Sequence, residues 1–371
     1  GIGDFYYAPP SGFLALCTAN LPDPVEAIDP AQGGSPQDYF NTVLWTGNGE
    51  EHTISGAGFQ PDLVWIKNRT SAYNHVLFDD VRGESQLLYS NLTNAEDTAT
   101  GQQIIASDGF TLGGGYNNTN ASGSSYVGWN WKAGTAFSND ASATSVGTID
   151  SAGSVNTDVG FSIISYAGNT TANAQIAHGL GVAPEVVIFK RRDGATDWHT
   201  YHAARADAAG TLMYLNTNSA GGDSAAFLND VAPSSTVINL GDSAGTNGSS
   251  MIAYCFASVD GYSKFGTYTG NGSTDGPFVY TGFRPAFVMV KMTSGTQRWG
   301  MTDSARAPNN PNFGSLYAED SLAEYTGTAH DRDYLSNGFK LRNTDTIFNG
   351  SGSTYIYMAF AEQNFKYANA R

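Results

Sequence analysis

Gly58-Phe-Gln-Pro-Asp-Leu-Val-Trp-Ile-Lys67 organises this chain, because similar stretches occur twice more, as Gly181-Val-Ala-Pro-Glu-Val-Val-Ile-Phe-Lys190 and Gly282-Phe-Arg-Pro-Ala-Phe-Val-Met-Val-Lys291. Three further positions match downstream without a gap. They are a Trp or His, an Asp or His, and an Arg: His75, Trp198 and Trp299, then Asp79, His202 and Asp303, then Arg82, Arg205 and Arg306. The spacing from Pro to Arg is 21 residues in every copy (61 to 82, 184 to 205 and 285 to 306). Such self-similarity indicates an internal repeat.

Other landmarks keep the same order around these stretches. A Gly-Asn turn precedes each copy, and each copy ends in an apolar strand, at Tyr126 to Trp131, Ile252 to Phe256 and Ile356 to Phe360. The period is about a hundred residues, which exceeds the length of a single propeller blade. We therefore predict three tandem units, over residues 40–148, 149–264 and 265–371.

The local pattern within each unit is that of β-strands. Short runs rich in Val, Ile, Tyr, Phe and Thr lie between clusters of Gly, Asn, Asp and Ser, and no helical stripe is present. In the closing strands one set of residues alternates with another, which is typical of a strand with one buried face. The predicted inward sets are Val127, Trp129 and Trp131, then Ile252, Tyr254 and Phe256, then Ile356, Met358 and Phe360. The sequence thus predicts an all-β chain of three antiparallel β-sandwiches of jelly-roll type, and disfavours a propeller or prism.

Residues 1–39 lie outside the repeat. Closely spaced prolines, as in Leu21-Pro-Asp-Pro24, and a Gly-Gly-Ser-Pro stretch at 33–36 are typical of a linker or an extended N-terminal arm. No basic-then-apolar leader stands at the start, so no signal peptide is expected. The apolar Phe13-Leu-Ala-Leu16 is expected to pack on the first unit or to add a strand to a neighbouring chain.

Composition narrows the function classes. The 371 residues include 18 basic and 34 acidic ones, a net charge of −16, and only 14% are charged against roughly 25% in an average domain. A nucleic-acid binder needs clustered Lys and Arg, so that class is disfavoured. No apolar run approaches the ~18 residues that would suggest a membrane-spanning helix. Cys17 and Cys255 are far apart and are interpreted as two buried thiols, with a disulfide as the alternative.

Two short motifs invite a chemical interpretation. Gly241-Asp-Ser-Ala-Gly245 fits the G-x-S-x-G pattern of hydrolases, but no helix-forming sequence follows it, so a turn is the favoured interpretation. His199 and His202 are three apart on a predicted strand and therefore point to opposite faces, which disfavours a shared metal ion. We expect no metal, no cofactor and no catalytic residue.

Pairs of acidic residues leave a glycosidase open as an alternative, since two carboxylates can meet from anywhere in the fold. The candidates by residue type are Glu50-Glu51, Asp79-Asp80 and Glu319-Asp320. Each is more simply interpreted as charge at a strand end or a solvated turn.

The triplicated polar residues are the best candidates for a repeated role. They are Lys67, Lys190 and Lys291, then Asp79, His202 and Asp303, then Arg82, Arg205 and Arg306. A fold constraint recurs in every unit, whereas catalysis rarely needs three copies, so we favour ion pairs or carbonyl contacts within each unit. The alternative is three weak sites for a sugar or another polar ligand, whose affinities would combine through avidity.

Several phrases resemble a known family. The opening Tyr7-Ala-Pro-Pro-Ser-Gly-Phe-Leu-Ala-Leu-Cys-Thr-Ala-Asn-Leu-Pro22 is similar to the segment that follows SPRY-like β-sandwiches in virion proteins of tailed phages, often marine or cyanobacterial. Phe59-Gln-Pro-Asp-Leu-Val-Trp-Ile-Lys-Asn-Arg69 and Tyr126-Val-Gly-Trp-Asn-Trp-Lys-Ala-Gly134 resemble the uncharacterised repeat domain beside it. The resemblance covers nearly the whole chain, which departs from the longer pattern by lacking the SPRY-like region, and it transfers no catalytic residue.

This resemblance implies a structural protein of the phage particle, such as a tail, neck or fibre component. Its expected partners are further copies of itself, other virion proteins and host surface glycans, without nucleic acid or membrane insertion. Its expected location is the virion, outside the cell. Two alternatives remain: a subunit of an extracellular filament joined through residues 1–39, and a secreted polysaccharide-degrading enzyme with acidic residues in a cleft between units.

Overall fold

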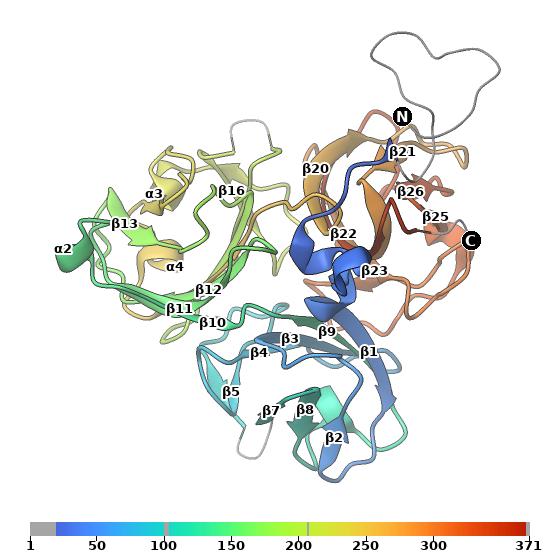
Figure 1. Cartoon of the computed structure of the whole chain (residues 1–371), viewed down its shortest axis with the longest axis horizontal. Coiled ribbons are helices and arrows are strands. Elements are labelled where there is room, and N and C mark those ends of the chain that lie inside the picture. Colours follow the sequence, from blue (N-terminus) through green and yellow to red (C-terminus); the bar gives the residue numbers. More distant parts are fainter. Residues whose placement is uncertain (1–19, 100–103, 206–207, 369–371) are drawn as a thin grey trace.

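Three groups of strands surround a common centre in this computed structural model, which describes residues 20–99, 104–205 and 208–368 (Figure 1). The prediction of an all-β chain is confirmed, since strands in antiparallel sheets make up most of the regular structure. The α-helices of the described residues are single turns: α1 (Asn117–Asn120), α2 (Ala141–Thr144), α3 (Ala225–Leu228) and α4 (Ala244–Asn247).

The first unit pairs a large sheet with a small one. The large sheet has the order β1-β9-β3-β4, with β1 (Phe40–Thr46), β9 (Ser125–Trp131), β3 (Leu63–Asn68) and β4 (Val76–Asp79). The small sheet has the order β2-β8-β7, with β2 (His52–Ile54), β8 (Gly109–Leu112) and β7 (Ile104–Ala106). A short pair lies beside them, formed by β5 (Gln86–Leu87) and β6 (Asp97–Thr98).

The second unit has the widest sheet. Its order is β10-β11-β12-β19-β14-β15-β16-β17, with β10 (Thr135–Asn139), β11 (Ser151–Asn156), β12 (Phe161–Tyr166), β19 (Met251–Phe256), β14 (Val186–Arg191), β15 (His199–His202), β16 (Thr211–Tyr214) and β17 (Gly222–Asp223). A two-stranded sheet faces it, formed by β13 (Ala174–Ala177) and β18 (Val237–Leu240).

The third unit repeats the arrangement. Its large sheet is β20-β27-β22-β23-β24, with β20 (Ser263–Thr269), β27 (Thr354–Asn364), β22 (Phe283–Met292), β23 (Trp299–Asp303) and β24 (Leu316–Tyr317). Its small sheet is β21-β26-β25, with β21 (Phe278–Tyr280), β26 (Gly338–Leu341) and β25 (Arg332–Leu335). In every unit the closing strand lies between the strand before the Gly-Asn turn (β1, β12 or β20) and the strand that carries the repeated lysine (β3, β14 or β22).

A separate hydrophobic core lies between the two sheets of each unit. In the first unit, Val64 and Phe78 from the large sheet pack with Ile54 and Phe110 from the small sheet. Equivalent clusters fill the second and third units. Cys255, on the inner face of β19, is a buried free thiol in the second of these clusters, and burial raises its pKa to about 12. Cys17 lies outside the described residues.

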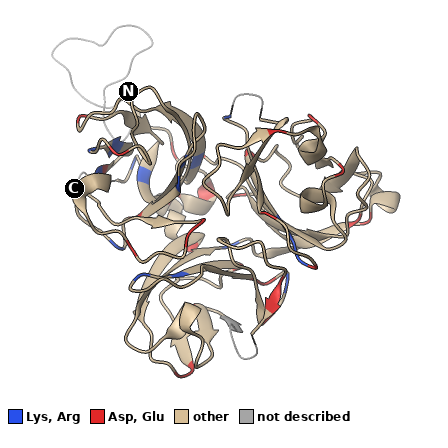
Figure 2. Ribbon diagram, turned by 180° about the vertical axis from the view of Figure 1, so that it is seen from behind, with Lys and Arg blue, Asp and Glu red and all other residues tan. Residues whose placement is uncertain are grey.

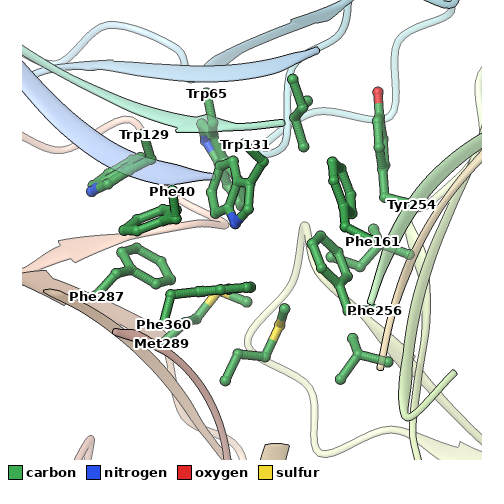
Figure 3. Packing of buried hydrophobic residues seen from close by; sticks show 14 of the residues in the cluster. Phe40, Trp65, Trp129, Trp131, Phe161, Tyr254, Phe256, Phe287, Met289 and Phe360 are labelled. Atoms are coloured by element: carbon green, nitrogen blue, oxygen red, sulfur yellow. The ribbon is translucent and has the colours of Figure 1, made fainter. Parts of the chain in front are cut away.

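A fourth core joins the three units. The opposite faces of the large sheets meet at the centre of the molecule, where Trp131, Phe256 and Phe360 from the three closing strands are buried in one cluster with Phe40 and Phe287 (Figure 3). The ring centroids of Phe40 and Phe360 are 5.1 Å apart, and those of Trp131 and Phe360 are 5.6 Å apart. Aromatic pairs at such spacings stabilise beyond their buried area.

This centre changes the interpretation of the closing strands. Their predicted inward residues do alternate as expected, but they face the shared centre rather than the core of their own unit. The intervening residues, such as Tyr126 and Tyr355, are also buried and face the core of their own unit. In a strand that is buried on both faces, the sequence pattern barely indicates which face packs into which core. The prediction that only one face of each closing strand is buried was therefore wrong. The three large sheets thus share one core at the centre of the molecule.

Residues 20–39 do not form the expected extended arm. They make three 3-10 turns, η2 (Glu26–Ile28), η3 (Pro30–Gln32) and η4 (Pro36–Asp38), and Ile28 is buried in the central core. The hydroxyl of Tyr367 donates to Asp29 over 3.0 Å, and Lys366 pairs with Asp23. Residues 20–39 therefore fold onto the end of the same chain. The stretch Phe13 to Leu16 lies outside the described residues.

One predicted boundary also falls differently. Residues 135–139 belong to the range 40–148 assigned to the first unit, but they form β10, which pairs with β11 at the edge of the second unit's sheet. The repeat has no counterpart of this strand after the second unit, so self-similarity carried no signal for it. The third unit begins at Ser263, where β20 pairs with β27, close to the predicted start at 265.

Candidate functional site

The triplicated polar residues lie at the three junctions between units, in a chain whose charges are sparse and scattered (Figure 2). At the junction of the first and second units, Asp79 accepts from Arg82 Nε over 2.6 Å, and both side chains are fully buried. Arg82 also forms an ion pair with Glu96 over 3.1 Å, and Glu96 pairs with Arg192 of the second unit over 2.9 Å. The Tyr254 hydroxyl of the second unit donates to Asp79 over 2.7 Å.

The same chain of contacts recurs where the third unit meets the first. Asp303 accepts from Arg306 Nε over 2.6 Å, and Arg306 reaches Glu324 over 2.7 Å. Glu324 pairs with Arg69 of the first unit over 2.7 Å, and the Trp129 indole donates to Asp303 over 3.0 Å. Burial by itself lowers the pKa of Arg306, but the charges and hydrogen bonds of Asp303 and Glu324 together outweigh it and leave the pKa above its usual value.

The junction of the second and third units uses neutral groups instead. His202 stands in place of the aspartate, and its Nε2 contacts the Tyr357 carbonyl of the third unit at 3.0 Å. Arg205 is only partly buried and donates to the Ala220 carbonyl. Gly221 stands seven residues past the tyrosine of its unit, the position that Glu96 and Glu324 occupy in theirs.

The three lysines are buried and donate to backbone carbonyls. Lys190 donates to Thr93 of the first unit over 3.0 Å, and Lys291 donates to Asn218 of the second unit over 2.8 Å. Lys67 instead donates to its own neighbour Asn68 over 2.6 Å. Burial lowers the pKa of each lysine to about 8.

The nine triplicated residues make contacts of both kinds. The Asp–Arg pairs and the arginine contacts to backbone carbonyls lie within single units, in line with the expectation from the sequence. Further contacts, which the sequence did not predict, join neighbouring units through Asp79, Asp303, His202, Lys190 and Lys291. Their contacts agree with a role in the fold, and the interpretation as three weak sugar sites stays a prediction. Sequence spacing revealed that these residues matter but not that their partners belong to a neighbouring unit, because the partners are up to 175 residues away, as for Tyr254 and Asp79.

A polar hollow of about 660 Å³ lies between the first and second units. Hydrogen-bonding side chains line its walls: Gln60, Asp62, Asp80, Lys132, Ser154 and Ser165. Phe137 on β10 also borders the hollow, but its ring packs against the core of the second unit, on the opposite face of the sheet from Ser154. Carboxylates, an ammonium group and hydroxyls together suit a ligand with many hydroxyls.

Asp62 is the most perturbed acid in this hollow. Its side chain accepts from the Ala133 amide over 2.8 Å, which ties the linker between the units to the start of β3. Burial raises the pKa of Asp62 to about 6, and the nearby charge of Asp80 acts in the same direction. Asp80 was one of the acidic candidates in the sequence, whereas Asp62 was overlooked because its burial cannot be read from the repeat.

Two further hollows flank residues 20–39. One of about 830 Å³ is lined by Glu26, Tyr39, Asp158 and Asp260, and one of about 250 Å³ is lined by Asp23, Lys264, Tyr280 and Lys366. Within residues 20–99, 104–205 and 208–368, no group of three or more His, Cys, Asp or Glu is placed to hold a metal ion.

The serine motif differs from its predicted turn. A single helical turn, α4, follows Ser243 directly, and the Ser243 hydroxyl lies 3.4 Å from His199 Nε2. In the sequence, His199 suggested only a metal ligand. Nothing in the spacing of 44 residues indicated that His199 and Ser243 would meet.

The outer face of the third unit's small sheet is aromatic. Phe278 and Tyr280 of the edge strand β21 are 44% and 56% exposed. Phe278 pairs with Lys340, as Thr53 pairs with Thr111 and Gln175 with Asn239 in the other units. Because the equivalent positions carry polar residues, the sandwich itself does not require an aromatic ring there.

Comparison with known proteins gives one result. Residues 35–364 match the family described as "Domain of unknown function (DUF7483)". No curated protein and no solved structure matches the chain. No helix in the described part of the chain is long and apolar enough to cross a membrane.

Proposed function

We propose that this chain, which belongs to the DUF7483 family, is a structural protein of a tailed-phage particle, a tail, neck or fibre component outside the cell. It meets further copies of itself, other virion proteins and host surface glycans. It acts by binding and not by catalysis in this role.

The observation that carries this proposal is the shared aromatic core with its buried junctions. A particle component exposed outside the cell must stay folded without help, and interlocked units resist local opening because each junction is held by its neighbours. Asp79 and Asp303 each bind two residues that come from two different units. The stretches of the sequence that resemble phage virion proteins support the same role.

We also propose that the units are three tandem β-sandwich repeats of jelly-roll type. The shared order of opening, closing and lysine-bearing strands supports this assignment. A single excised unit would expose its share of the central core, such as Phe256 and Tyr254, to water. An isolated segment 135–262, which includes β10, should therefore aggregate or assemble into threes, and a stable monomer would contradict the proposed interdependence.

Glycan contact is assigned to the polar hollow between the first and second units. Asp80 and Lys132 offer an acceptor and donors for the hydroxyls of a sugar. The assembly contact is assigned to Phe278 and Tyr280 on the edge strand β21, where a second copy can pair along the free strand edge.

Electron microscopy tests the location. Particles from a host culture are labelled with gold-conjugated antibody against residues 208–368. Labels on the tail, neck or head support the proposal, and labels on free filaments in the same culture favour the filament alternative instead.

Binding to purified host polysaccharide and to neutral oligosaccharides tests the glycan assignment. Asp80→Ala should weaken binding at least tenfold, and Glu51→Ala, which removes an exposed carboxylate outside the hollow, serves as the control that leaves it unchanged. Because the pKa of Asp62 is about 6, its carboxylate gains a proton as the pH falls below that value, and binding that uses it as an acceptor should weaken there. Equal binding by wild type and Asp80→Ala would overturn the assignment.

A second candidate function is cleavage of a polysaccharide in the same hollow. It is favoured by one observation: Asp62, with its pKa raised to about 6, and the more exposed Asp80 lie in one cavity, and acid and base roles in glycosidases rest on carboxylates with different pKa values. Release of reducing ends from host polysaccharide, abolished in Asp62→Asn and Asp80→Asn, would establish it. Binding without any release would remove it.

A further inference from the structure

Ser243 and His199 occupy a place in the second unit that the proposed function does not use. Ser243 precedes α4, and His199 opens β15 in the neighbouring sheet. The Ser243 Oγ to His199 Nε2 distance is 3.4 Å. This is longer than an ordinary hydrogen bond, but contacts between a nucleophile and its base are commonly long in an unliganded site and shorten around the substrate.

The other ring nitrogen of His199 fixes how the ring is protonated. Nδ1 lies 3.1 Å from the Asp197 carbonyl, which can only accept a hydrogen bond. Nδ1 therefore carries the hydrogen, and the lone pair of Nε2 points toward the Ser243 hydroxyl. An orienting acceptor, a base and a nucleophile in this order are the arrangement that activates a serine.

The surroundings hold His199 in this pose. Its ring lies against Tyr214 and Phe227, with centroid distances of 5.3 and 6.2 Å. A side chain at Gly245 would collide with it, since a Cβ there would be 1.9 Å from the ring. The last glycine of the G-x-S-x-G motif thus makes room for the base, a reason specific to this fold.

His199 is also neutral, as a general base must be before it accepts a proton. It is 7% exposed, and burial lowers its pKa below the ordinary value. Lys190, whose charge acts in the same direction, and Asp197, whose charge and carbonyl oppose it, are the charged neighbours that the structure places around the ring. Ser243 itself is partly exposed, so a reagent can reach it.

The pair is particular to the second unit. The position one residue past the Trp or His landmark is His199 here, but it is Val76 in the first unit and Gly300 in the third. In the third unit the ring of Phe348 lies over Gly300, so an aromatic side chain from the opposite side fills that space. The fold therefore does not need a histidine at this position to fill the space.

We propose that Ser243 is a nucleophile that His199 activates, and that it accepts the acyl group of a small carboxylic ester. In this step the Ser243 oxygen forms a bond to the ester carbonyl carbon as the bond to the leaving alkoxide breaks. The hydroxyl proton passes to His199 Nε2 and then to the alkoxide, which leaves as an alcohol. Water reverses the sequence, releases the acid and restores the serine.

The test is labelling of the full chain with a fluorophosphonate, followed by intact mass and peptide mapping. We expect one adduct per chain, on Ser243, and a labelling rate that rises with pH and levels off once His199 is neutral. His199→Gln should label about 100-fold or more slowly, the usual contribution of a general base.

The control variants separate chemistry from folding. Ser243 Oγ also accepts from the Gly245 amide over 3.2 Å, so Ser243→Asn, which keeps a capping acceptor, is the variant that removes the nucleophile. Ser224→Ala removes a partly exposed serine at the start of α3 and should label like the wild type. Labelling spread over many serines, no labelling at all, or a pH-independent rate in the wild type would each overturn the proposal, whether or not His199→Gln folds.

Discussion

The junction of the second and third units differs from the other two in its charges, although all three hold equivalent strands together. Two junctions contain a buried Asp–Arg pair that continues through a glutamate to an arginine of the next unit. The third uses the neutral His202 and a partly exposed Arg205. The comparison shows that the fold needs a hydrogen bond across each junction but does not need an ion pair.

The backbone explains why the charged chain is missing there. Gly221 adopts φ +84°, and a Cβ at this position would lie 2.3 Å from the Leu212 carbonyl. A glutamate like Glu96 therefore cannot stand there without strain. Without a carboxylate at position 221, the charge of a fully buried Arg205 would lack one of its partners. Arg205 accordingly lies nearer the surface.

The largest expected effect separates Arg82 from Arg205. Arg82→Ala leaves the Asp79 carboxylate buried without its cation and should lower the free energy of unfolding by about 3–5 kcal/mol. Arg205→Ala, the matched variant at the neutral junction, should lower it by less than about 1 kcal/mol. Urea unfolding followed by tryptophan fluorescence measures both. Equal losses would mean that the two junctions are energetically alike.

The second expectation is a pH effect at the neutral junction. Burial lowers the pKa of His202 to about 4, so the unfolded chain, with an ordinary histidine pKa near 6.5, binds more protons between these values. Stability is therefore present above pH 6.5 and is lost as the pH falls toward 4, by roughly 3 kcal/mol from this residue.

His202→Gln isolates that contribution. The variant should lose less stability than the wild type between pH 7.5 and pH 4.5, because the other buried histidines, such as His178, titrate equally in both proteins. Parallel stability curves for the two proteins would show that His202 does not carry this pH dependence.

The third expectation concerns coupling within the charged pair. Asp79→Asn alone leaves the buried Arg82 with Glu96 as its remaining carboxylate partner, whereas Asp79→Asn with Arg82→Met removes both charges of the pair. The double variant should be about 2 kcal/mol more stable than the sum of the two single losses predicts. Additive losses would indicate that each residue acts through separate partners.

The smallest expectation tests the backbone explanation. Gly221→Glu should fail to rebuild the missing chain and should lower the free energy of unfolding by about 1–2 kcal/mol, because a side chain at positive φ is strained. Gly222→Ala, at the exposed neighbouring glycine with open space around it, is the control with little effect. A stabilised Gly221→Glu would show that charge, and not the backbone, sets the difference.

The sequence predicted the all-β class and the repeated polar positions because spacing and alternation survive in a linear pattern. It did not predict the shared centre, because Trp131 or Phe256 is equally apolar whether it faces one core or another. It missed β10, since a single linking strand leaves no trace in a repeat. The hollow beside Asp62 and the meeting of Ser243 with His199 depend on distant segments, whose approach no local pattern records.

The junction of the third and first units closes the ring of units by contact alone. The chain itself crosses from the first unit to the second and from the second to the third, whereas the third and first units meet through contacts such as that of Glu324 with Arg69. The two ends of the described chain already meet, since Lys366 pairs with Asp23. A circular permutant that joins these ends and begins near Asp260 would keep every junction in place. The arrangement of the units in space thus does not depend on which unit comes first along the chain, and the permuted chain should reach the same fold.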